Sequence, residues 1–274
     1  MNRLLQIGRV ACRVPLALGL LICGLLIVRL GFPRLGQAAR DRMVSRWSRL
    51  LLRVCGVRLV EIPAPGAAPL ASLHGSALLL ANHINWIDVF LVLSVCPSHF
   101  VAKIEISRWP LVGALVAGVG TLFVERGRRR AVHQLNDRIE NTLRIARRVV
   151  VFPEGTTSDG RRLLQFHGNL IEPALQTGAP IVPVGIRYRG LDGEPTEAVL
   201  FVGEMTMLES AWRLLGAPGV LAELHPLPAI SGATRQAVAV RARRLLAERL
   251  ALPMDDAQSE TLRRARAGAP AASG

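Results

Sequence analysis

A histidine and an aspartate separated by four residues stand inside an apolar run. Residues 81–90 read ANHINWIDVF and place Asn82, His83, Asn85 and Asp88 among large hydrophobic side chains. One turn of chain folds Asp88 back toward His83, so that the carboxylate accepts a proton from one imidazole nitrogen and raises the basicity of the other. The spacing predicts a general base aimed at a substrate hydroxyl. An aspartate that only caps a helix, beside an incidental histidine, is the competing interpretation.

A second polar segment follows another apolar run. Residues 149–160 read VVVFPEGTTSDG, in which Gly155 permits unusual backbone angles and Thr156 and Thr157 add hydroxyls. Backbone amides in such a loop can hold an anion. Glu154 then needs a different partner, either a substrate hydroxyl or an arginine. A plain β-turn is the alternative.

A third segment, residues 120–130, reads GTLFVERGRRR. Cations at a helix N-terminus oppose the helix dipole, so helix stability does not explain Arg128, Arg129 and Arg130. Solvated charge remains an alternative for these three. Arg126 follows the apolar run more closely and is the candidate for gripping a phosphate or another anionic headgroup through a bidentate contact.

The elements that position these residues alternate between short β-rich runs and helical patterns, which predicts an α/β fold with a mostly parallel sheet flanked by helices. Polar segments that follow strands then gather at the carboxyl edge of the sheet, where ligands bind. A helix is expected over 130–147, and Ser231 is expected to cap a later one. The predicted strands are 58–62, 77–81, 99–103, 121–125, 149–152, 181–188 and 198–203.

Composition narrows the possible partners. The 274 residues carry a formal charge of +14, and the basic side chains are almost all arginine because Lys103 is the only lysine. Aromatic residues make up 4%, and no zinc finger or other nucleic-acid motif is present. We therefore expect a membrane surface or an acidic protein as partner, and no nucleic acid. The four cysteines have no C-x-x-C pairing and are expected to be reduced, and a lone His83 and Asp88 pair has too few ligands for a metal, so no metal or cofactor is expected.

The N-terminus predicts membrane attachment. Residues 14–28 carry no charge, and counting back to Val10 gives 19 residues interrupted only by Arg13. That length is near the lower limit of the roughly 17 to 25 residues that cross a bilayer, and a cleaved signal peptide is the alternative. An arginine-rich amphipathic pattern follows, which favours a globular part on the cytoplasmic side of the inner membrane. The expected organisation is an anchor with a basic amphipathic helix over 1–56, an α/β domain over 57–252 and a disordered tail over 253–274.

These segments together resemble the glycerolipid acyltransferases, the family that contains bacterial 1-acyl-sn-glycerol-3-phosphate acyltransferases. NHINWID matches the family's N-H-x4-D box, and GTLFVERG, FPEGTTSDG and APIVPVGI are similar to its second, third and fourth blocks, in the same order. The four blocks extend over about residues 80 to 187.

The resemblance implies that His83, held by Asp88, deprotonates the hydroxyl of a lysolipid, which attacks the thioester of acyl-CoA or acyl carrier protein without an acyl-enzyme. It further implies that the acceptor site is lined by Arg126, Glu154, Gly155 and Thr156, with Pro183 in its wall. An acidic carrier protein suits the basic surface.

One position departs from the family pattern. Thr157 stands where members that form phosphatidic acid usually have an arginine after E-G-T, which removes a cation from the expected phosphate site. His167 stands near the place of a second family cation. Phosphatidic acid formation is the first hypothesis because Arg126 is retained, and acylation of lyso-ornithine lipid or another lysolipid is the alternative. A hydrolase that releases free fatty acid and a non-catalytic membrane-binding protein are hypotheses from other classes.

Overall fold

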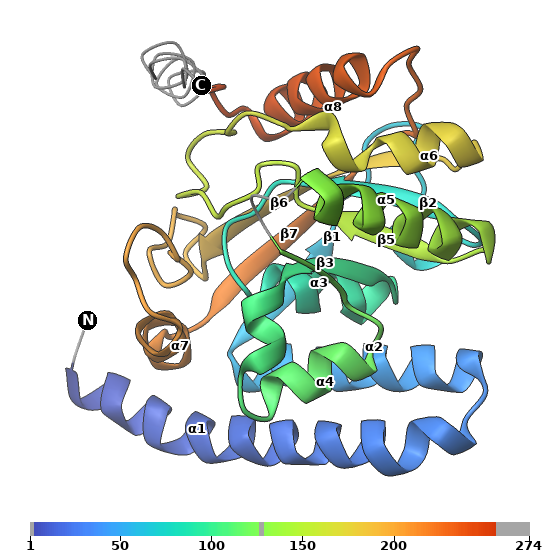
Figure 1. Cartoon of the computed structure of the whole chain (residues 1–274). Helices are drawn as coiled ribbons and strands as arrows, with labels where there is room; N and C mark the ends of the chain where they lie inside the picture. The colour runs from blue at the N-terminus through green and yellow to red at the C-terminus, as the bar shows by residue number, and fades with distance from the viewer. Residues whose placement is uncertain (1–2, 126–128, 256–274) are drawn as a thin grey trace, which may run out of the picture.

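A seven-stranded sheet between two layers of helices forms the centre of the molecule, as the computed structural model shows for residues 3–125 and 129–255 (Figure 1). The strand order is β1-β7-β6-β2-β5-β3-β4. The strands β6, β2, β5, β3 and β4 are parallel, whereas β7 and β1 run antiparallel to β6. The predicted α/β class is therefore confirmed. The strand bounds are Val57–Glu61 (β1), Ala77–Ala81 (β2), His99–Lys103 (β3), Leu122–Val124 (β4), Arg148–Val151 (β5), Ile181–Gly190 (β6) and Val220–Pro226 (β7).

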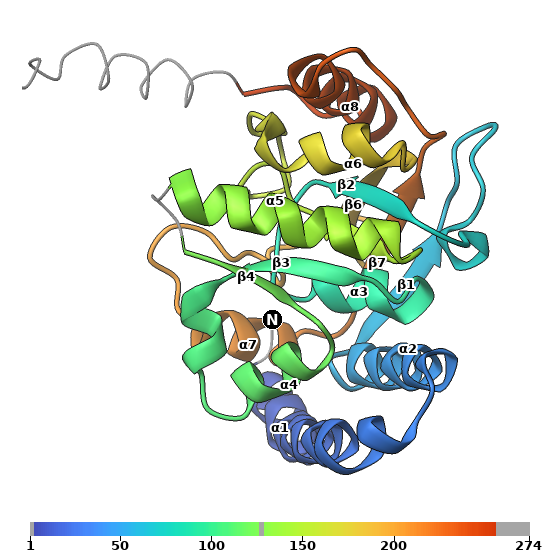
Figure 2. The same cartoon turned by 45° about the vertical axis from the view of Figure 1, so that its right-hand side comes forward.

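Helices cover both faces of the sheet (Figures 1 and 2). One layer contains α5 (Arg129–Arg144), α6 (Glu172–Thr177) and α8 (Arg235–Leu250). The other contains α1 (Arg3–Leu26), α2 (Gln37–Val54), α3 (Asp88–Val95), α4 (Val112–Gly118) and α7 (Met207–Gly216). A π-helical turn at Ile27–Gly31 extends α1, and short 3-10 turns lie at Phe32–Arg34, Leu70–Ser72, Ile104–Arg108 and Gly168–Leu170.

Strand β2 shows why the centre of the sheet is apolar. All five of its residues are buried, because successive side chains point to opposite faces and both faces are covered by helices. Leu78 and Leu80 join the hydrophobic cluster beneath α5, α6 and α8, whereas Leu79 and Ala81 join the cluster beneath α2 and α3. The strand is thereby held rigidly at the point where its carboxyl end delivers Asn82 and His83.

Two expectations were wrong. Residues 198–203 do not form a strand, because their carbonyl groups accept hydrogen bonds from side chains: Val199 from Asn85 and Phe201 from Thr157. The seventh strand is β7, whose apolar run is interrupted by Glu223 and His225.

The cap of the last helix is also displaced from its expected position. Ser231 does not cap α8; the hydroxyl of Thr234 does so by accepting from the N–H of Ala237. The helix expected over 130–147 is α5, which ends at Arg144, and Ala146 has a positive φ of 58° that the helix cannot continue through.

The N-terminal helix is long and apolar, yet it packs along the globular part. Within the helical segment Arg3–Arg34, a stretch of 18 residues has a mean hydropathy of 2.3 and is 11% buried, so the segment is long and apolar enough to cross a membrane by length and composition. Arg13 donates to the carbonyl oxygens of Leu215 (3.0 Å) and Ala217 (2.7 Å) at the end of α7. Cations suit a helix C-terminus, where carbonyl groups lack partners, so these contacts fix α1 against α7.

Candidate functional site

The loop between β2 and α3 wraps its backbone around the carboxylate of Asp88. The Nδ1 atom of His83 lies 2.8 Å from the Oδ2 atom of Asp88, and the same oxygen accepts from the N–H groups of Ile84 (2.7 Å) and Asn85 (3.0 Å). Because an ionised carboxylate only accepts, we assign the proton to Nδ1, which leaves Nε2 as the basic nitrogen. The Asp88 side chain is fully buried, whereas that of His83 is 20% exposed. Within 3–125 and 129–255, Nε2 has no hydrogen-bond partner, so it is available to an incoming molecule.

The second oxygen of Asp88 has its own donor. The hydroxyl of Tyr188, on β6, donates to Oδ1 of Asp88. Burial raises the pKa of Tyr188 well above its ordinary value, with the charge of Asp88 acting in the same direction, so the phenol keeps its proton. Tyr188 was not among the site residues predicted from the sequence. Its signal was a tyrosine in an otherwise buried strand, because a buried phenol requires a hydrogen-bond partner.

Two asparagines fix the loop to the rest of the domain. Asn82 exchanges hydrogen bonds with the backbone of Ile186, its Nδ2 donating to the carbonyl (3.0 Å) and its Oδ1 accepting from the N–H (2.7 Å). Asn85 donates to the carbonyl of Val199 (2.7 Å) and accepts from the N–H of Ile87 (2.9 Å). Both asparagines are fully buried. The loop therefore holds His83 in one position relative to β6.

Glu154 lies behind the histidine. Its Oε2 accepts from the backbone N–H of His83 at 3.3 Å, and its side chain is only 4% exposed. Burial raises the pKa of Glu154 to about 8, against the opposing effect of the His83 N–H. Its Oε1 is buried and has no hydrogen-bond partner among the described residues. The sequence predicted that Glu154 needs a partner, either a substrate hydroxyl or an arginine. In the structure, one of its oxygens accepts a hydrogen bond from the backbone N–H of His83.

The loop after β5 lies against the same histidine. The ring of Phe152 stacks on the imidazole with centroids 3.9 Å apart, and the N–H of Ser158 donates to the carbonyl of His83 (2.8 Å). Gly155 has a φ of +70°, the left-handed conformation that its sequence position suggested, and Thr156 is exposed. Thr157 donates its hydroxyl to the carbonyl of Phe201.

The structure thus brings together most of the predicted site residues. His83, Asp88 and Glu154 are linked by hydrogen bonds, and Gly155 and Thr156 follow Glu154 directly. Pro183 lies on β6 beside Leu80 of β2, and the backbone N–H of His167 donates to the carbonyl of Pro153. Arg126 lies outside the described residues.

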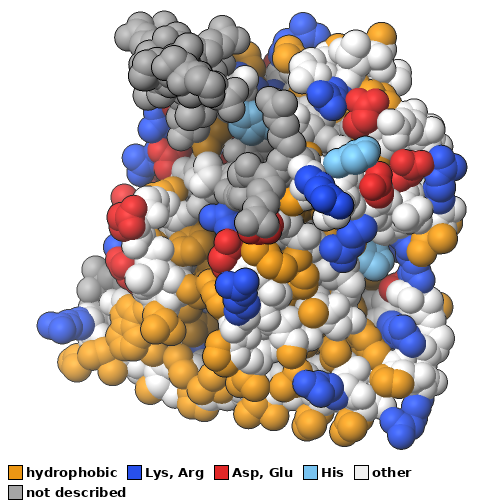
Figure 3. All heavy atoms as spheres, in the orientation of Figure 1, with side chains coloured by type: hydrophobic (Ala, Val, Ile, Leu, Met, Phe, Trp, Pro, Cys, Tyr) orange, Lys and Arg blue, Asp and Glu red, His pale blue; other side chains and the backbone are white. Residues whose placement is uncertain are grey.

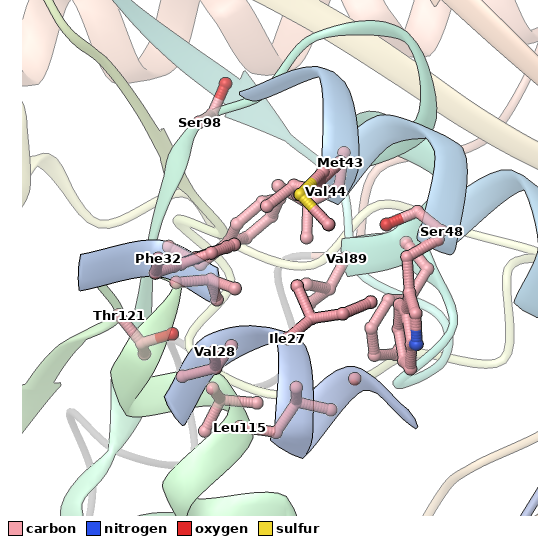
Figure 4. Close-up of a pocket in the computed structure, with 17 residues that line it drawn as sticks. Ile27, Val28, Phe32, Met43, Val44, Ser48, Val89, Ser98, Leu115 and Thr121 are labelled. Carbon is pink, nitrogen blue, oxygen red and sulfur yellow. The ribbon is translucent and has the colours of Figure 1, made fainter. Parts of the chain in front are cut away.

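An apolar cavity lies beside this site (Figure 4). Val89 and Phe90, which follow Asp88 on α3, form one wall, and Phe100 of β3 lies next to them. The ring of Phe100 is 5.9 Å from that of Phe152, which stacks on His83. The remaining lining residues come from the end of α1 and the turns after it, α2, α4 and the segments around β3: Gly24, Ile27, Val28, Phe32, Met43, Val44, Trp47, Ser48, Leu93, Ser98, Leu115, Val116, Val119 and Thr121.

In the part of the chain that the structure describes, histidine, cysteine, aspartate and glutamate side chains form no group of three or more that could hold a metal ion. The nitrogen of His83 that faces Asp88 is already occupied by a hydrogen bond. The arrangement instead suits proton transfer at Nε2.

Comparison with known proteins agrees with this chemistry. The model of the Acyltransferase family matches residues 62–187. A lyso-ornithine lipid O-acyltransferase of Pseudomonas aeruginosa is 35% identical over 252 residues, 91% of this chain and 93% of that protein. A 1-acyl-sn-glycerol-3-phosphate acyltransferase of Neisseria meningitidis is 35% identical over 181 residues, 65% of this chain and 67% of that protein.

A solved structure shares the fold. The crystal structure of the 1-acyl-sn-glycerophosphate acyltransferase of Thermotoga maritima aligns with a TM-score of 0.59 and covers 88% of this chain and 96% of that one. The identity is 18%, so this similarity concerns the fold alone.

Proposed function

Because the chain belongs to the acyltransferase family, we propose that it moves a fatty acyl group from a thioester to the hydroxyl of a lysolipid, with His83 as general base and Asp88 as the acid that orients it. The observation that carries the proposal is the 2.8 Å contact between Nδ1 of His83 and Oδ2 of Asp88, which leaves Nε2 facing outward from a partly exposed side chain. Residues 57–252 form the catalytic domain in this proposal, and residues 1–56 attach it to the membrane.

The reaction is a direct transfer. Nε2 of His83 takes the proton of the lysolipid hydroxyl as its oxygen attacks the thioester carbonyl carbon. The resulting tetrahedral intermediate expels the thiolate. The C–S bond breaks, and the new C–O ester bond remains. The protonated His83 then returns its proton to the thiolate. Asp88 stabilises the imidazolium between these two steps without itself taking the proton.

The apolar cavity, with a volume of about 50 Å³, has room for a short part of the acyl chain. The cavity begins beside α3, whose first residue is Asp88, and its lining is almost entirely hydrophobic. Burial of a hydrocarbon chain contributes about 0.8 kcal/mol per methylene group. We infer that the donor is acyl-CoA or acyl carrier protein, the second of which is acidic and suits a chain with a formal charge of +14.

Two acceptors are supported by specific observations. The hydroxyl of Thr157 donates to the backbone of Phe201, so this position supplies neither a cation nor an uncommitted donor for a phosphate. That contact and the match over 91% of the chain favour lyso-ornithine lipid. The Neisseria meningitidis relative favours 1-acyl-sn-glycerol-3-phosphate and therefore phosphatidic acid as product. Arg126 and Thr156 are proposed to contact the acceptor headgroup in either case, with the buried Glu154 supporting the site from behind His83.

Membrane association is part of the proposal. Hydrophobic side chains gather along α1 and near α7 on the lower part of the molecule (Figure 3). On α7, Leu208 is 83% exposed and Trp212 is 49% exposed. Because α1 packs along the domain through Arg13, we infer that this surface lies in one leaflet of the inner membrane, on its cytoplasmic side. The exposed apolar residues of the N-terminal segment are Leu4, Leu5, Ile7, Leu16, Leu18, Ile22, Leu26 and Leu30.

Acyl transfer by the purified protein tests the proposal. Radiolabelled acyl thioester is supplied with lyso-ornithine lipid and with 1-acyl-sn-glycerol-3-phosphate in parallel, and labelled lipid and free fatty acid are separated. We expect His83→Ala to lower lipid product by roughly 10²- to 10⁴-fold. His133→Ala, an exposed histidine on α5, is the matched control and should retain the activity. Label in free fatty acid alone, or equal lipid product from His83→Ala, would refute the acyltransferase mechanism.

A further inference from the structure

We infer that Tyr188 is a positioning residue of this site: its hydroxyl holds the second oxygen of Asp88 and thereby sets how strongly Asp88 acts on His83. The inference rests on the proposed role of His83 as base. Tyr188 lies outside the four sequence blocks that carry the predicted histidine, acids and arginine. The observation behind the inference is the hydrogen bond from the Tyr188 hydroxyl to Asp88.

The contact completes the hydrogen bonding of a buried carboxylate. Oδ2 of Asp88 accepts from His83, Ile84 and Asn85, and Oδ1 accepts from Tyr188. A buried acceptor without a donor is costly, so Oδ1 needs the phenol or a replacement for it. Tyr188 lies two residues beyond Ile186 on β6. The backbone N–H and carbonyl of Ile186 are both hydrogen-bonded to the side chain of Asn82. The same strand therefore fixes both the phenol and the loop that carries the histidine.

The phenol also distributes charge. A hydrogen bond to Oδ1 draws negative charge away from Oδ2, which weakens the attraction between Asp88 and an imidazolium at His83. Loss of the hydroxyl leaves Asp88 a stronger partner for protonated His83 and a more readily protonated acid. Both effects raise the pH above which neutral His83 and ionised Asp88 are present together. The acidic limb of the pH–rate profile should therefore move to higher pH.

Other ionisable groups around the pair are few among the described residues. Glu154 lies behind His83 on the loop after β5 and bonds the backbone N–H of that residue. Arg243, on α8, interacts electrostatically with Glu154. The charge of Asp88 also acts on Glu154, so a shift of the profile reports on Asp88 and the two groups coupled to it, His83 and Glu154.

The composition of the chain offers an unusually selective experiment. Tyr188 is the only tyrosine in 274 residues, so fluorinated tyrosines incorporated throughout the protein change this position alone. Successive fluorine atoms on the ring make the phenol a stronger hydrogen-bond donor while the side chain keeps its shape. Burial raises the pKa of Tyr188 and keeps it protonated across the assay range.

The test measures kcat and KM against pH for the full-length protein with the wild-type residue, with Tyr188→Phe and with the fluorotyrosine series. Tyr188→Phe should move the acidic limb up by about 0.5 to 1 pH unit, with KM changed less than twofold. The fluorotyrosines should move the limb down in order of their acidity. Leu224→Val, a fully buried core change on neighbouring β7, should leave the limb in place.

The outcomes separate this inference from the proposed function. If His83→Ala abolishes acyl transfer while the fluorotyrosine series leaves the acidic limb unmoved, Tyr188 has no positioning role and the mechanism stands. If His83→Ala retains acyl transfer, the mechanism itself fails. The fluorotyrosine proteins keep the test decisive should Tyr188→Phe fail to fold.

Discussion

Replacing Glu154 by glutamine should remove a pH dependence of stability that the wild-type protein carries. The carboxyl group is 4% exposed, and burial raises its pKa from an ordinary 4.5 to about 8. A carboxyl whose pKa is raised by folding binds its proton more tightly in the folded state. Its contribution to stability is fully present below about pH 4.5 and is lost as the pH rises toward about 8.

The size of the effect follows from the shift. Each pKa unit corresponds to about 1.4 kcal/mol, so the difference between 4.5 and about 8 corresponds to a loss of about 5 kcal/mol in the free energy of unfolding. About half of that loss, roughly 3 kcal/mol, falls between pH 5 and pH 7. Glu154→Gln keeps an oxygen that can accept from the N–H of His83 but has no proton to release, so its free energy of unfolding should not carry this loss.

Denaturant unfolding of the detergent-solubilised protein at a series of pH values between 5 and 8.5 measures the effect. The difference between Glu154→Gln and wild type should grow in favour of the variant as the pH rises. Glu204→Gln, which changes an exposed carboxylate, is the matched control and should run parallel to wild type. Parallel curves for wild type and Glu154→Gln across this range would show that folding does not raise the pKa of the buried carboxyl.

Three further changes test the backbone, the cavity and the acceptor site. Gly120→Ala places a Cβ 2.4 Å from Nδ1 of His99, whereas Gly193→Ala has the same φ of +86° with open space around the new Cβ. In denaturant unfolding, Gly120→Ala should therefore lose at least ~1 kcal/mol more of the free energy of unfolding than Gly193→Ala. Val116→Phe fills part of the apolar cavity, and product analysis with thioesters of different length should show a shift toward shorter acyl chains. Thr157→Arg introduces a cation, so parallel assays should show a higher ratio of 1-acyl-sn-glycerol-3-phosphate to lyso-ornithine lipid acylation; an unchanged ratio would exclude this position from acceptor choice.

Local patterns predicted the centre of the fold because they act over short distances. The buried run over 77–81 is a strand as predicted, and the polar residues after it lie at the carboxyl edge of the sheet. The spacing of His83 and Asp88 was sufficient to predict their hydrogen bond, since a single turn of chain joins them. Their roles in catalysis stay predictions until the variants are assayed.

Local sequence patterns did not predict contacts between residues that are far apart in the chain. Tyr188 lies 100 residues from Asp88 in the sequence, and only the pairing of β6 with β2 brings them together. Distant contacts also explain the wrong strand at residues 198–203. Their apolar composition resembles that of a strand, but two of their carbonyl groups accept hydrogen bonds from the side chains of Asn85 and Thr157. Strand β7 was missed because Glu223 and His225, which are hydrogen-bonded to each other at 3.0 Å, interrupt its apolar run.

The two acids beside His83 are distinguished by their donors rather than by their distance from it. Asp88 accepts four hydrogen bonds, three on one oxygen and one on the other, so both of its buried oxygens have donors. Glu154 is also buried, and burial raises its pKa to about 8 against the opposing effects of the backbone N–H groups of His83 and Leu164. Asp88 is thereby suited to stabilising an imidazolium, whereas a largely neutral Glu154 supports the position of His83 without adding a second negative charge beside the hydroxyl that must lose its proton.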